Sequence, residues 1–296
     1  MASCRNTTPG VAGLPPELPR PATTTDGGAL RAADGSGLPA VDRRTPEAGV
    51  ADYVDRYWSV RWDVPRPSER AVLAHPAIHI TVEQGSGRMH GHDLPAVLVH
   101  GVVRRTFRVE LRDSGWVFGA KFRPGGFAAA FDTDASALTG RVIGLDQIVP
   151  AADGTTLRDQ VLGAPTQEHR AAAMDRWLAD RIPATPDPDY AAVLRVVTAM
   201  LGDRTMVRAE DVAALHGVSL RALQRLFKRF VGVGPKWLLA RYRLHDAIAA
   251  IEQDTCEAGD LAGLAASLGW FDQAHFTREF TALVGVSPLA YRSRPR

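Results

Sequence analysis

The chain has 296 residues, of which 45% are hydrophobic and 23% are charged, so most of it is expected to fold around apolar cores as about two domains. No run reaches the roughly 18 apolar residues that cross a bilayer, and no basic stretch followed by an apolar core begins the chain, so neither a membrane span nor a secretory signal is expected. The two cysteines offer neither a disulfide framework nor a zinc-finger spacing, which favours a cytoplasmic protein.

The net charge of +2 is unevenly distributed along the chain. From Tyr190 onward, 14 Lys and Arg face 10 Asp and Glu, which gives +4 for this part and −2 for residues 1–189. A basic C-terminal third is compatible with a polyanionic partner.

Residues 1–45 are rich in Pro, Gly, Thr and Ala without an apolar period, and they predict a disordered tail. Residues 46–182 predict a β-rich regulatory domain that ends in a helix over 167–182. Phe107, Val109 and Leu111 alternate with charged residues, as in a half-buried strand. The expected strands are 77–83, 96–103, 106–111 and 116–122.

Prolines at 183, 186 and 188 predict a linker over 183–189. Everything in 190–296 predicts helix, so the expected fold class is α+β: a β-rich sensor or dimerisation domain followed by an all-α domain. The expected helices of the second domain are 190–201, 209–215, 220–230, 235–252, 260–268, 273–284 and 288–293.

The all-α domain contains the same unit twice. Positions of the first copy recur 52 or 53 residues later in the second, namely Gly217, Ser219, Leu223, Arg225 and Phe227 as Gly269, Asp272, Phe276, Arg278 and Phe280. In each copy the glycine can take the positive φ that ends a helix, and the Ser or Asp can cap the next one. The repeat therefore predicts two helix-turn-helix units.

The second helix of each unit has a polar outward face. In the first unit this face carries Arg221, Gln224, Arg225 and Lys228, and in the second Gln273, Thr277, Arg278 and Thr281. Arg can bind guanine and Gln adenine with two hydrogen bonds, and each good pair discriminates by about 1–3 kcal/mol. A merely solvated face is the alternative, which the duplication makes less favourable.

The helix predicted over 235–252 connects the two units. Its 18 residues span about 27 Å, so it could hold the two recognition helices roughly one DNA turn, about 34 Å, apart. A single chain could then read two successive major grooves.

These residues resemble the DNA-binding domain of the AraC-type transcriptional regulators. The resemblance covers about 190–296 and is closest in the stretch Leu264-Ala-Ala-Ser-Leu-Gly-Trp-Phe-Asp-Gln-Ala-His-Phe-Thr-Arg-Glu-Phe280, continued by Val284-Gly-Val-Ser-Pro288 and Tyr291-Arg292. It implies two helix-turn-helix units that bind DNA and recruit or block RNA polymerase.

Positions carried over from the family, together with Lys228 from the helix face, give the expected DNA-binding residues: Arg221, Gln224, Arg225, Lys228, Gln273, Ala274, His275, Thr277 and Arg278. Two positions depart from the family pattern. Trp270 stands where Phe or Tyr is usual and is expected to pack all the same. Ala274 is too short for a hydrogen bond to a base but could touch a thymine methyl.

The front domain is similar to an uncharacterised N-terminal domain of some family members, on the strength of Tyr57-Trp58, Trp62 and the stretch Phe122-Arg-Pro-Gly-Gly-Phe127. Regulatory domains of the wider family are often β-barrels that bind small effectors or dimerise. The glycine-rich stretch could cradle an anion, but a strand-to-helix turn is favoured. The tryptophans are expected in the core rather than as a ligand platform.

Five histidines of the front domain, His75, His79, His90, His92 and His100, raise the alternative of a metal site. His90-Gly91-His92 has H-x-H spacing and Glu83 precedes it, but Asp93 and Leu94 stand where a cupin-like order would soon bring a Glu. We therefore expect no metal and no cofactor. No nucleotide-binding or hydrolase motif is present in the sequence, so no enzymatic activity is expected.

Together these patterns predict a cytoplasmic, sequence-specific regulator of transcription that reads two major grooves and is modulated through its front domain. The expected partners are double-stranded DNA, RNA polymerase, a small-molecule effector and a second copy of the chain, with no membrane. The alternative is a small-molecule-binding or enzymatic front domain whose helical part is a protein-interaction module. A gel shift on the protein's own upstream DNA would separate the two.

Overall fold

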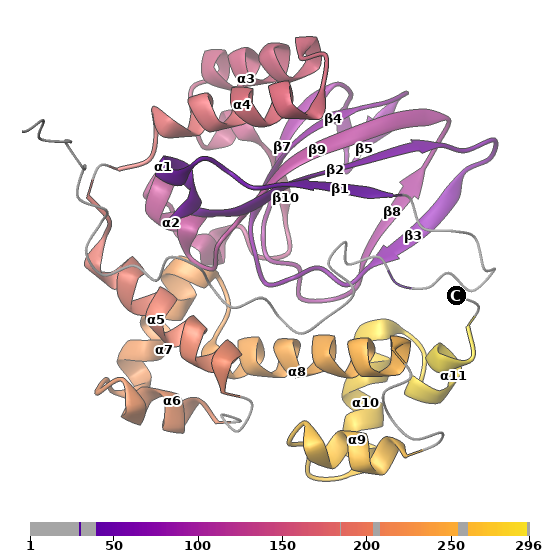
Figure 1. Ribbon diagram of the computed structural model, residues 1–296, viewed down its shortest axis with the longest axis vertical. Coiled ribbons are helices and arrows are strands. Elements are labelled where there is room, and N and C mark those ends of the chain that lie inside the picture. The colour runs from indigo at the N-terminus through magenta and orange to yellow at the C-terminus, as the bar shows by residue number, and fades with distance from the viewer. Residues whose placement is uncertain (1–29, 31–39, 184, 204–207, 254–259, 295–296) are drawn as a thin grey trace, which may run out of the picture.

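The computed structural model describes residue 30 and residues 40–183, 185–203, 208–253 and 260–294. A β-rich front part precedes a helical C-terminal part, in which short helices gather at both ends of one long helix (Figure 1). The arrangement confirms the predicted fold class, with a β-rich domain followed by two helix-turn-helix units and a connecting helix.

Among the described residues, six strands form one antiparallel sheet. Their order is β1 (Val41–Arg44), β2 (Val54–Asp63), β9 (Ser114–Phe122), β4 (His79–Gln84), β7 (Ala96–His100) and β10 (Val142–Gly144). A separate ladder pairs β3 (Ser68–Val72) with β8 (Phe107–Leu111), and a hairpin pairs β5 (Arg88–Met89) with β6 (His92–Asp93). The four strands expected from the sequence are confirmed as β4, β7, β8 and β9.

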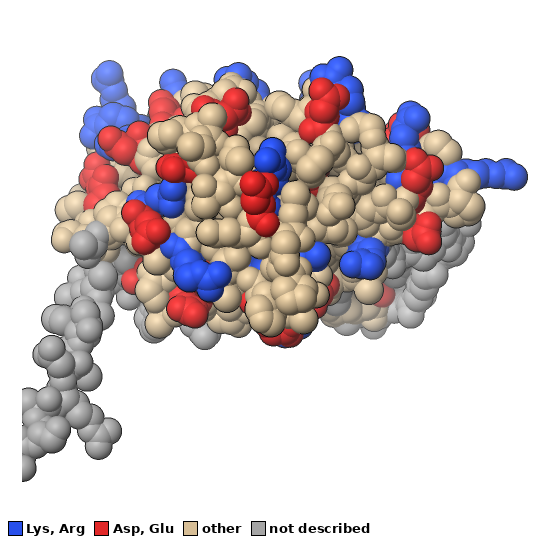
Figure 2. Space-filling model, turned by 90° about the horizontal axis from the view of Figure 1, so that it is seen from above, with Lys and Arg blue, Asp and Glu red and all other residues tan. Residues whose placement is uncertain are grey.

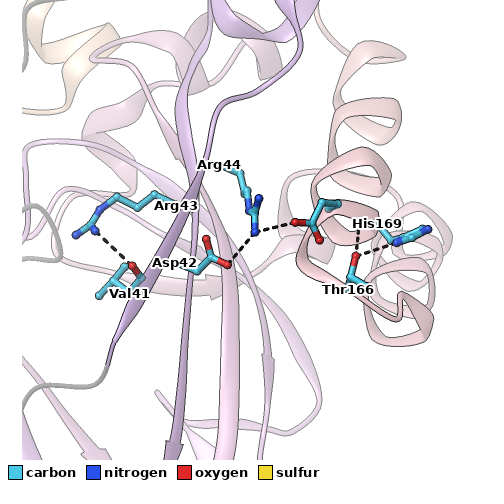
Figure 3. Close-up of polar contacts among 7 residues, drawn as sticks. Val41, Asp42, Arg43, Arg44, Thr166 and His169 are labelled. Carbon is cyan, nitrogen blue, oxygen red and sulfur yellow. Dashed lines mark hydrogen bonds and ion pairs between the residues drawn. The ribbon is translucent and has the colours of Figure 1, made fainter.

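The predicted disordered tail is wrong for residues 41–44, and residues 1–29 and 31–39 lie outside the described residues. β1 pairs with β2 along its whole length, so main-chain hydrogen bonds rather than an apolar period fix it. Arg44 forms ion pairs with Asp42 at 3.3 Å and with Glu168 at 2.8 Å (Figure 3). Glu168 lies in the first turn of the helix Gln167–Ala179, which Thr166 caps. This strand is therefore tied to both the sheet and a helix.

Helices of the front part lie beside the sheet. They are α1 (Ala48–Ala51), α2 (Gly126–Phe131), α3 (Ala151–Gly163) and α4 (Gln167–Ala179), with short 3-10 turns at Ala135–Ala137 and Leu145–Gln147. Apolar residues of α4 are buried as its spacing predicts, although the helix ends at Ala179 instead of residue 182. The hydroxyl of Tyr57 on β2 donates to Asp175 Oδ1 at 2.6 Å and so links the sheet to α4.

The helical part begins with α5 (Pro188–Gly202), inside the stretch predicted as a linker. The remaining helices are α6 (Ala209–Leu215), α7 (Leu220–Val231), α8 (Pro235–Glu252), α9 (Leu261–Ser267), α10 (Gln273–Val284) and α11 (Pro288–Arg292). Three of them, α6, α8 and α10, have the predicted bounds. Helix α8 is buried on most sides rather than amphipathic, and Pro235 starts it at a position where no N–H is needed.

One apolar core continues from the sheet into α5, α7 and α8. Tyr190 of α5 stacks on Tyr53 at 5.3 Å, and its hydroxyl donates to the carbonyl of Asp52 at 2.7 Å. Gly125 takes φ 88°, and a Cβ there would lie 3.1 Å from the Tyr190 ring and 3.3 Å from Phe230. The close approach of the two parts therefore depends on a glycine at this position.

A second apolar core joins α8 to α9, α10 and α11, and it includes Leu73 of the front part. On the upper face of the molecule, basic and acidic side chains are interspersed rather than segregated (Figure 2). Within the described residues, no helix combines the length and apolar character that a membrane crossing requires.

Candidate nucleic-acid interface

The first helix-turn-helix unit consists of α6 and α7. Gly217 ends the turn after α6 with φ 63°, as its position in the repeat predicts. The side-chain oxygen of Ser219 accepts a hydrogen bond from the backbone N–H of Ala222 at 3.1 Å and so caps α7. The predicted turn glycine and cap are both confirmed.

Helix α7 separates its residues into two faces. Leu223, Phe227 and Phe230 are buried. The outward face is exposed and carries the four residues predicted there, Arg221, Gln224, Arg225 and Lys228. In the described part of the chain none of these four side chains enters an ion pair, so their charges and hydrogen-bond donors face solvent.

The second unit repeats this construction with α9 and α10. Gly269 has φ 80°, and the carboxylate of Asp272 accepts a hydrogen bond from the backbone N–H of His275 at 2.6 Å. Trp270 is buried as expected, lies 4.9 Å from the Phe276 ring, and donates its indole N–H to Glu279 at 2.7 Å. The departure from the family pattern at this position is therefore accommodated by packing.

The outward face of α10 presents Gln273, Ala274 and Arg278 to solvent, with Thr277 half-buried beside them. His275 is also half-buried, and its Nε2 lies 3.4 Å from Glu279 Oε1. The same glutamate thus contacts both Trp270 and His275, which leaves Gln273, Thr277 and Arg278 as the available hydrogen-bond donors on this face.

Helix α8 carries one unit at each end (Figure 1). Its 18 residues correspond to about 27 Å of helix. Arg243 donates to the carbonyl of Gly269 at 2.9 Å, and the hydroxyl of Tyr291 on α11 donates to Glu252 at 2.6 Å. These bonds fix the turn and the last helix of the second unit to the connecting helix.

Helix α8 also contacts the front part. Arg241 is 2% exposed and donates to the carbonyls of Ala74, Val103 and Arg104 at 3.4, 3.1 and 2.9 Å. Burial lowers the pKa of Arg241 to about 10, which still leaves it charged at neutral pH. The sequence does not predict this contact, because nothing in the helical spacing of Arg241 distinguishes a buried arginine from a solvated one.

A pair of buried histidines lies next to Arg241. The rings of His75 and His245 stack with centroids 4.2 Å apart and an interplanar angle of 9°. Burial and the charges of Arg241 and Lys121 lower the pKa of His245 to about 3, so it is neutral near pH 7. An uncharged ring is therefore part of the contact between α8 and the front part.

The front part contains a cavity of about 200 Å³. It is lined by both the six-stranded sheet and the β3–β8 ladder, and its walls are mostly apolar. Trp58, Trp62 and Phe107 form part of the wall, so two of the tryptophans expected in the core also face this space. His75 lines the cavity as well, which places it between the cavity and α8.

One side of the cavity holds Glu83, His90 and His100, here called the Glu83 cluster. His100 Nε2 lies 3.0 Å from Glu83 Oε1, and His90 Nε2 lies 3.8 Å from Glu83 Oε2. Burial raises the pKa of Glu83, but the hydrogen bond from His100 and the neighbouring histidine charges outweigh it and leave the pKa below its ordinary value. Burial also lowers the pKa of His90 to about 4.

The glycine-rich stretch after β9 forms the predicted strand-to-helix turn. Arg123 is buried and donates through Nε to the carbonyl of Ala51 at 2.6 Å. This side chain is thus used within the fold, and the alternative of an anion cradle loses its charged group.

Two family descriptions match the chain. Residues 212–294 match "Helix-turn-helix domain", and residues 42–144 match "Domain of unknown function (DUF6597)". The HTH-type transcriptional activator RhaR of Pectobacterium carotovorum subsp. carotovorum is 33% identical over 122 residues, which cover 40% of this chain and 42% of that protein. RhaR of Pectobacterium atrosepticum is 34% identical over 87 residues, which cover 29% of this chain and 30% of that protein.

The match therefore spans less than half the length of these relatives. Among solved structures, unsaturated fatty acid bound wild-type ToxT of Vibrio cholerae aligns with a TM-score of 0.43 and 13% identity. The alignment covers 81% of this chain and 95% of the ToxT chain. The resemblance noted in the sequence is confirmed: the chain carries a C-terminal helix-turn-helix domain of the AraC type behind a domain of unknown function.

Proposed function

We propose that the protein is a cytoplasmic, sequence-specific DNA-binding regulator of transcription that inserts α7 and α10 into two successive major grooves. The observation that carries the proposal is the pair of capped, outward helix faces, each with an exposed Gln and Arg, at the two ends of α8. The base-contacting set is the predicted one: Arg221, Gln224, Arg225, Lys228, Gln273, Ala274, His275, Thr277 and Arg278.

The named relatives RhaR are transcriptional activators, and this supports the same class of activity here. No catalytic role is assigned to the chain. RNA polymerase and a second copy of the chain are further proposed partners, in line with the sequence resemblance.

We further propose that a small molecule in the front cavity regulates DNA binding. His75 lines the cavity and stacks on His245 of α8, the helix that connects the two units. A ligand that moves His75 would change the packing of α8, and with it the relative orientation of α7 and α10. The physical link is a continuous set of buried contacts, not distance alone.

The experiment is fluorescence anisotropy with labelled duplexes that cover the DNA upstream of the protein's own gene. Binding at low salt is expected, and the affinity should fall linearly on a log–log scale with salt as phosphate contacts compete with counterions. A double variant Arg225→Ala/Arg278→Ala should lose sequence preference, whereas Arg158→Ala on α3 should not. A folded protein that binds no duplex at low salt would support the protein-interaction alternative instead.

A further inference from the structure

The Glu83 cluster combines donor groups from three separate elements. Glu83 lies on β4 and His100 on the neighbouring strand β7. His90 lies in the two-residue turn between β5 and β6. One ligand atom from each of these three side chains lies within 4.8 Å of the others, so a sheet and a hairpin converge on one point of the cavity wall.

The turn that carries His90 is unusual for a residue with a side chain. His90 and Gly91 have φ 53° and 84°, the left-handed region that costs a non-glycine residue on the order of 1 kcal/mol or more. This conformation directs the imidazole inward, where its ring centroid lies 5.0 Å from that of His100. Positive φ at both central residues is usual in two-residue hairpin turns, so the turn explains how His90 is positioned beside the sheet.

The donor set suits a divalent transition metal. Two imidazole nitrogens and one carboxylate oxygen are typical ligands of Zn²⁺ and its neighbours, whereas Mg²⁺ and Ca²⁺ prefer oxygen alone. Around a tetrahedral ion with bonds of about 2.0–2.1 Å, ligand atoms lie about 3.3 Å apart. His100 Nε2 lies 3.0 Å from Glu83 Oε1 and His90 Nε2 lies 3.8 Å from the other oxygen, Oε2. One ligand atom from each residue lies within 4.8 Å of the other two, so the three side chains would close in by up to about 1.5 Å to hold an ion.

Glu83 is buried, and one of its carboxylate oxygens lacks a hydrogen bond to any residue that the structure describes. Its side chain is 3% exposed, and Oε2 has no hydrogen-bond partner among the described residues. The other oxygen accepts a hydrogen bond from the Thr81 hydroxyl at 2.8 Å, which would orient a metal-binding carboxylate. Leaving a buried carboxylate oxygen without a hydrogen bond costs stability, and a bound cation would remove that cost.

We propose that Glu83, His90 and His100 bind a divalent transition-metal ion, with Zn²⁺ as the first choice, and leave one coordination position open to the cavity. The expectation of no metal rested on the absence of a cupin-like Glu after His90-Gly91-His92, whereas the cluster uses Glu83 and His100 and leaves His92 out. A use of the ion in regulation, with a small ligand completing its coordination, rests on the proposed function. Metal binding itself does not.

The test uses the untagged full-length chain, stripped with a chelator and titrated with ZnCl₂ by calorimetry and with CoCl₂ by absorption. One equivalent of metal is expected, with the visible bands of four-coordinate Co²⁺. Glu83→Gln, His90→Gln and His100→Gln should each weaken binding at least tenfold. His92→Gln is the matched control from the same hairpin and should bind as the wild type does.

Thermal unfolding of each chelated variant checks that it is folded. Absence of micromolar metal binding in the folded wild type would overturn the proposal, and so would equal weakening by His90→Gln and His92→Gln. Anisotropy with DNA is measured in parallel on the same samples. Metal binding without DNA binding would contradict only the proposed function, whereas DNA binding without metal binding would contradict only the metal site.

Discussion

Arg225 and Arg278 occupy equivalent positions in the two copies of the repeated unit, and both side chains are exposed on the outward face of their helix. An arginine that binds guanine with two hydrogen bonds discriminates against the wrong base by about 1–3 kcal/mol. We expect Arg225→Ala and Arg278→Ala each to relax preference at one base position, roughly tenfold to a hundredfold. Competition titrations against single-base variants of the bound site measure this.

The control for these variants is Arg158→Ala, which removes a half-buried arginine of α3 that pairs with its sequence neighbour Asp159 at 3.0 Å. It should leave both affinity and base preference unchanged. If the two helix variants instead weakened binding equally on every sequence, the arginines would contact phosphate and the base-contact assignment would be wrong.

The two candidate sites differ in how far the sequence could predict them. The outward residues of α7 and α10 follow from a regular helical period and from the repeat, both of which are local. The Glu83 cluster joins residues 83, 90 and 100 through a strand pairing and a left-handed turn, which no spacing rule contains. The sequence spacing therefore suggested His92 as the second histidine of a metal site beside His90, whereas the fold places His100 there.

At the scale of elements, α8 links the recognition helices to the front part. Its Arg241 donates to three carbonyls, and a guanidinium can do so because its N–H groups are spread over a rigid plane. Arg241→Lys keeps the charge but loses this geometry, so the free energy of unfolding should fall by about 1–3 kcal/mol. Urea unfolding at neutral pH measures the loss.

The matched control is Arg158→Lys, a half-buried surface position whose ion pair is with its sequence neighbour Asp159, where the change should cost less than about 0.5 kcal/mol. A similar small loss at Arg241 would contradict the structural role assigned to it. Arg241→Lys should also change the affinity for DNA, because α8 connects the two helix-turn-helix units.

The histidine pair on the same helix predicts a pH dependence. The pKa of His245 is about 3 in the folded chain and near 6.5 when unfolded, so the unfolded state binds the proton more readily. Stability should therefore be complete above pH 6.5 and fall as the pH drops toward 3, with about 2 kcal/mol lost by pH 5 from this residue. His79, which has a pKa of about 3, adds to the same slope.

Unfolding free energies of wild type and His245→Gln between pH 8 and pH 5 test this prediction. The value at pH 8 gives the cost of the substitution itself, since the native imidazole is neutral there. Below pH 6.5 the free energy of unfolding of the variant should fall less steeply with decreasing pH than that of the wild type, by the equivalent of about one bound proton. A slope identical to that of the wild type would mean that His245 is protonated in the folded state.

The elements themselves were predictable to very different degrees. Helix bounds in the C-terminal part follow from caps and apolar periods. β2 was missed, because a bulge between Val54 and Arg56 interrupts its alternation and Arg56 faces the cavity with a charge. β1 was missed because its four residues are fixed by pairing with β2 and by the ion pair of Arg44 with Glu168, both of which are contacts with distant parts of the chain. Strands held by their neighbours carry little signal of their own.

At the scale of the whole molecule, the front part and the first helix-turn-helix unit share one apolar core, and Thr106 donates a hydrogen bond to the carbonyl of Leu283 in the second unit. Both units are therefore in contact with the front part as well as with α8. A ligand signal can reach the recognition helices through packing at two places, which a flexible tether between separate domains would not allow.

This rigidity leads to a prediction about operator spacing. If α8 holds α7 and α10 at a fixed separation, the two half-sites must lie about one helical turn apart. An insertion of about 5 base pairs between them turns the second half-site to the opposite face, and affinity should fall on the order of a hundredfold. An insertion of about 10 base pairs restores the face but exceeds the reach of α8, whose 18 residues span about 27 Å, so it should not restore affinity. Recovery at 10 base pairs would show that the two units move independently and that α8 is not the spacer.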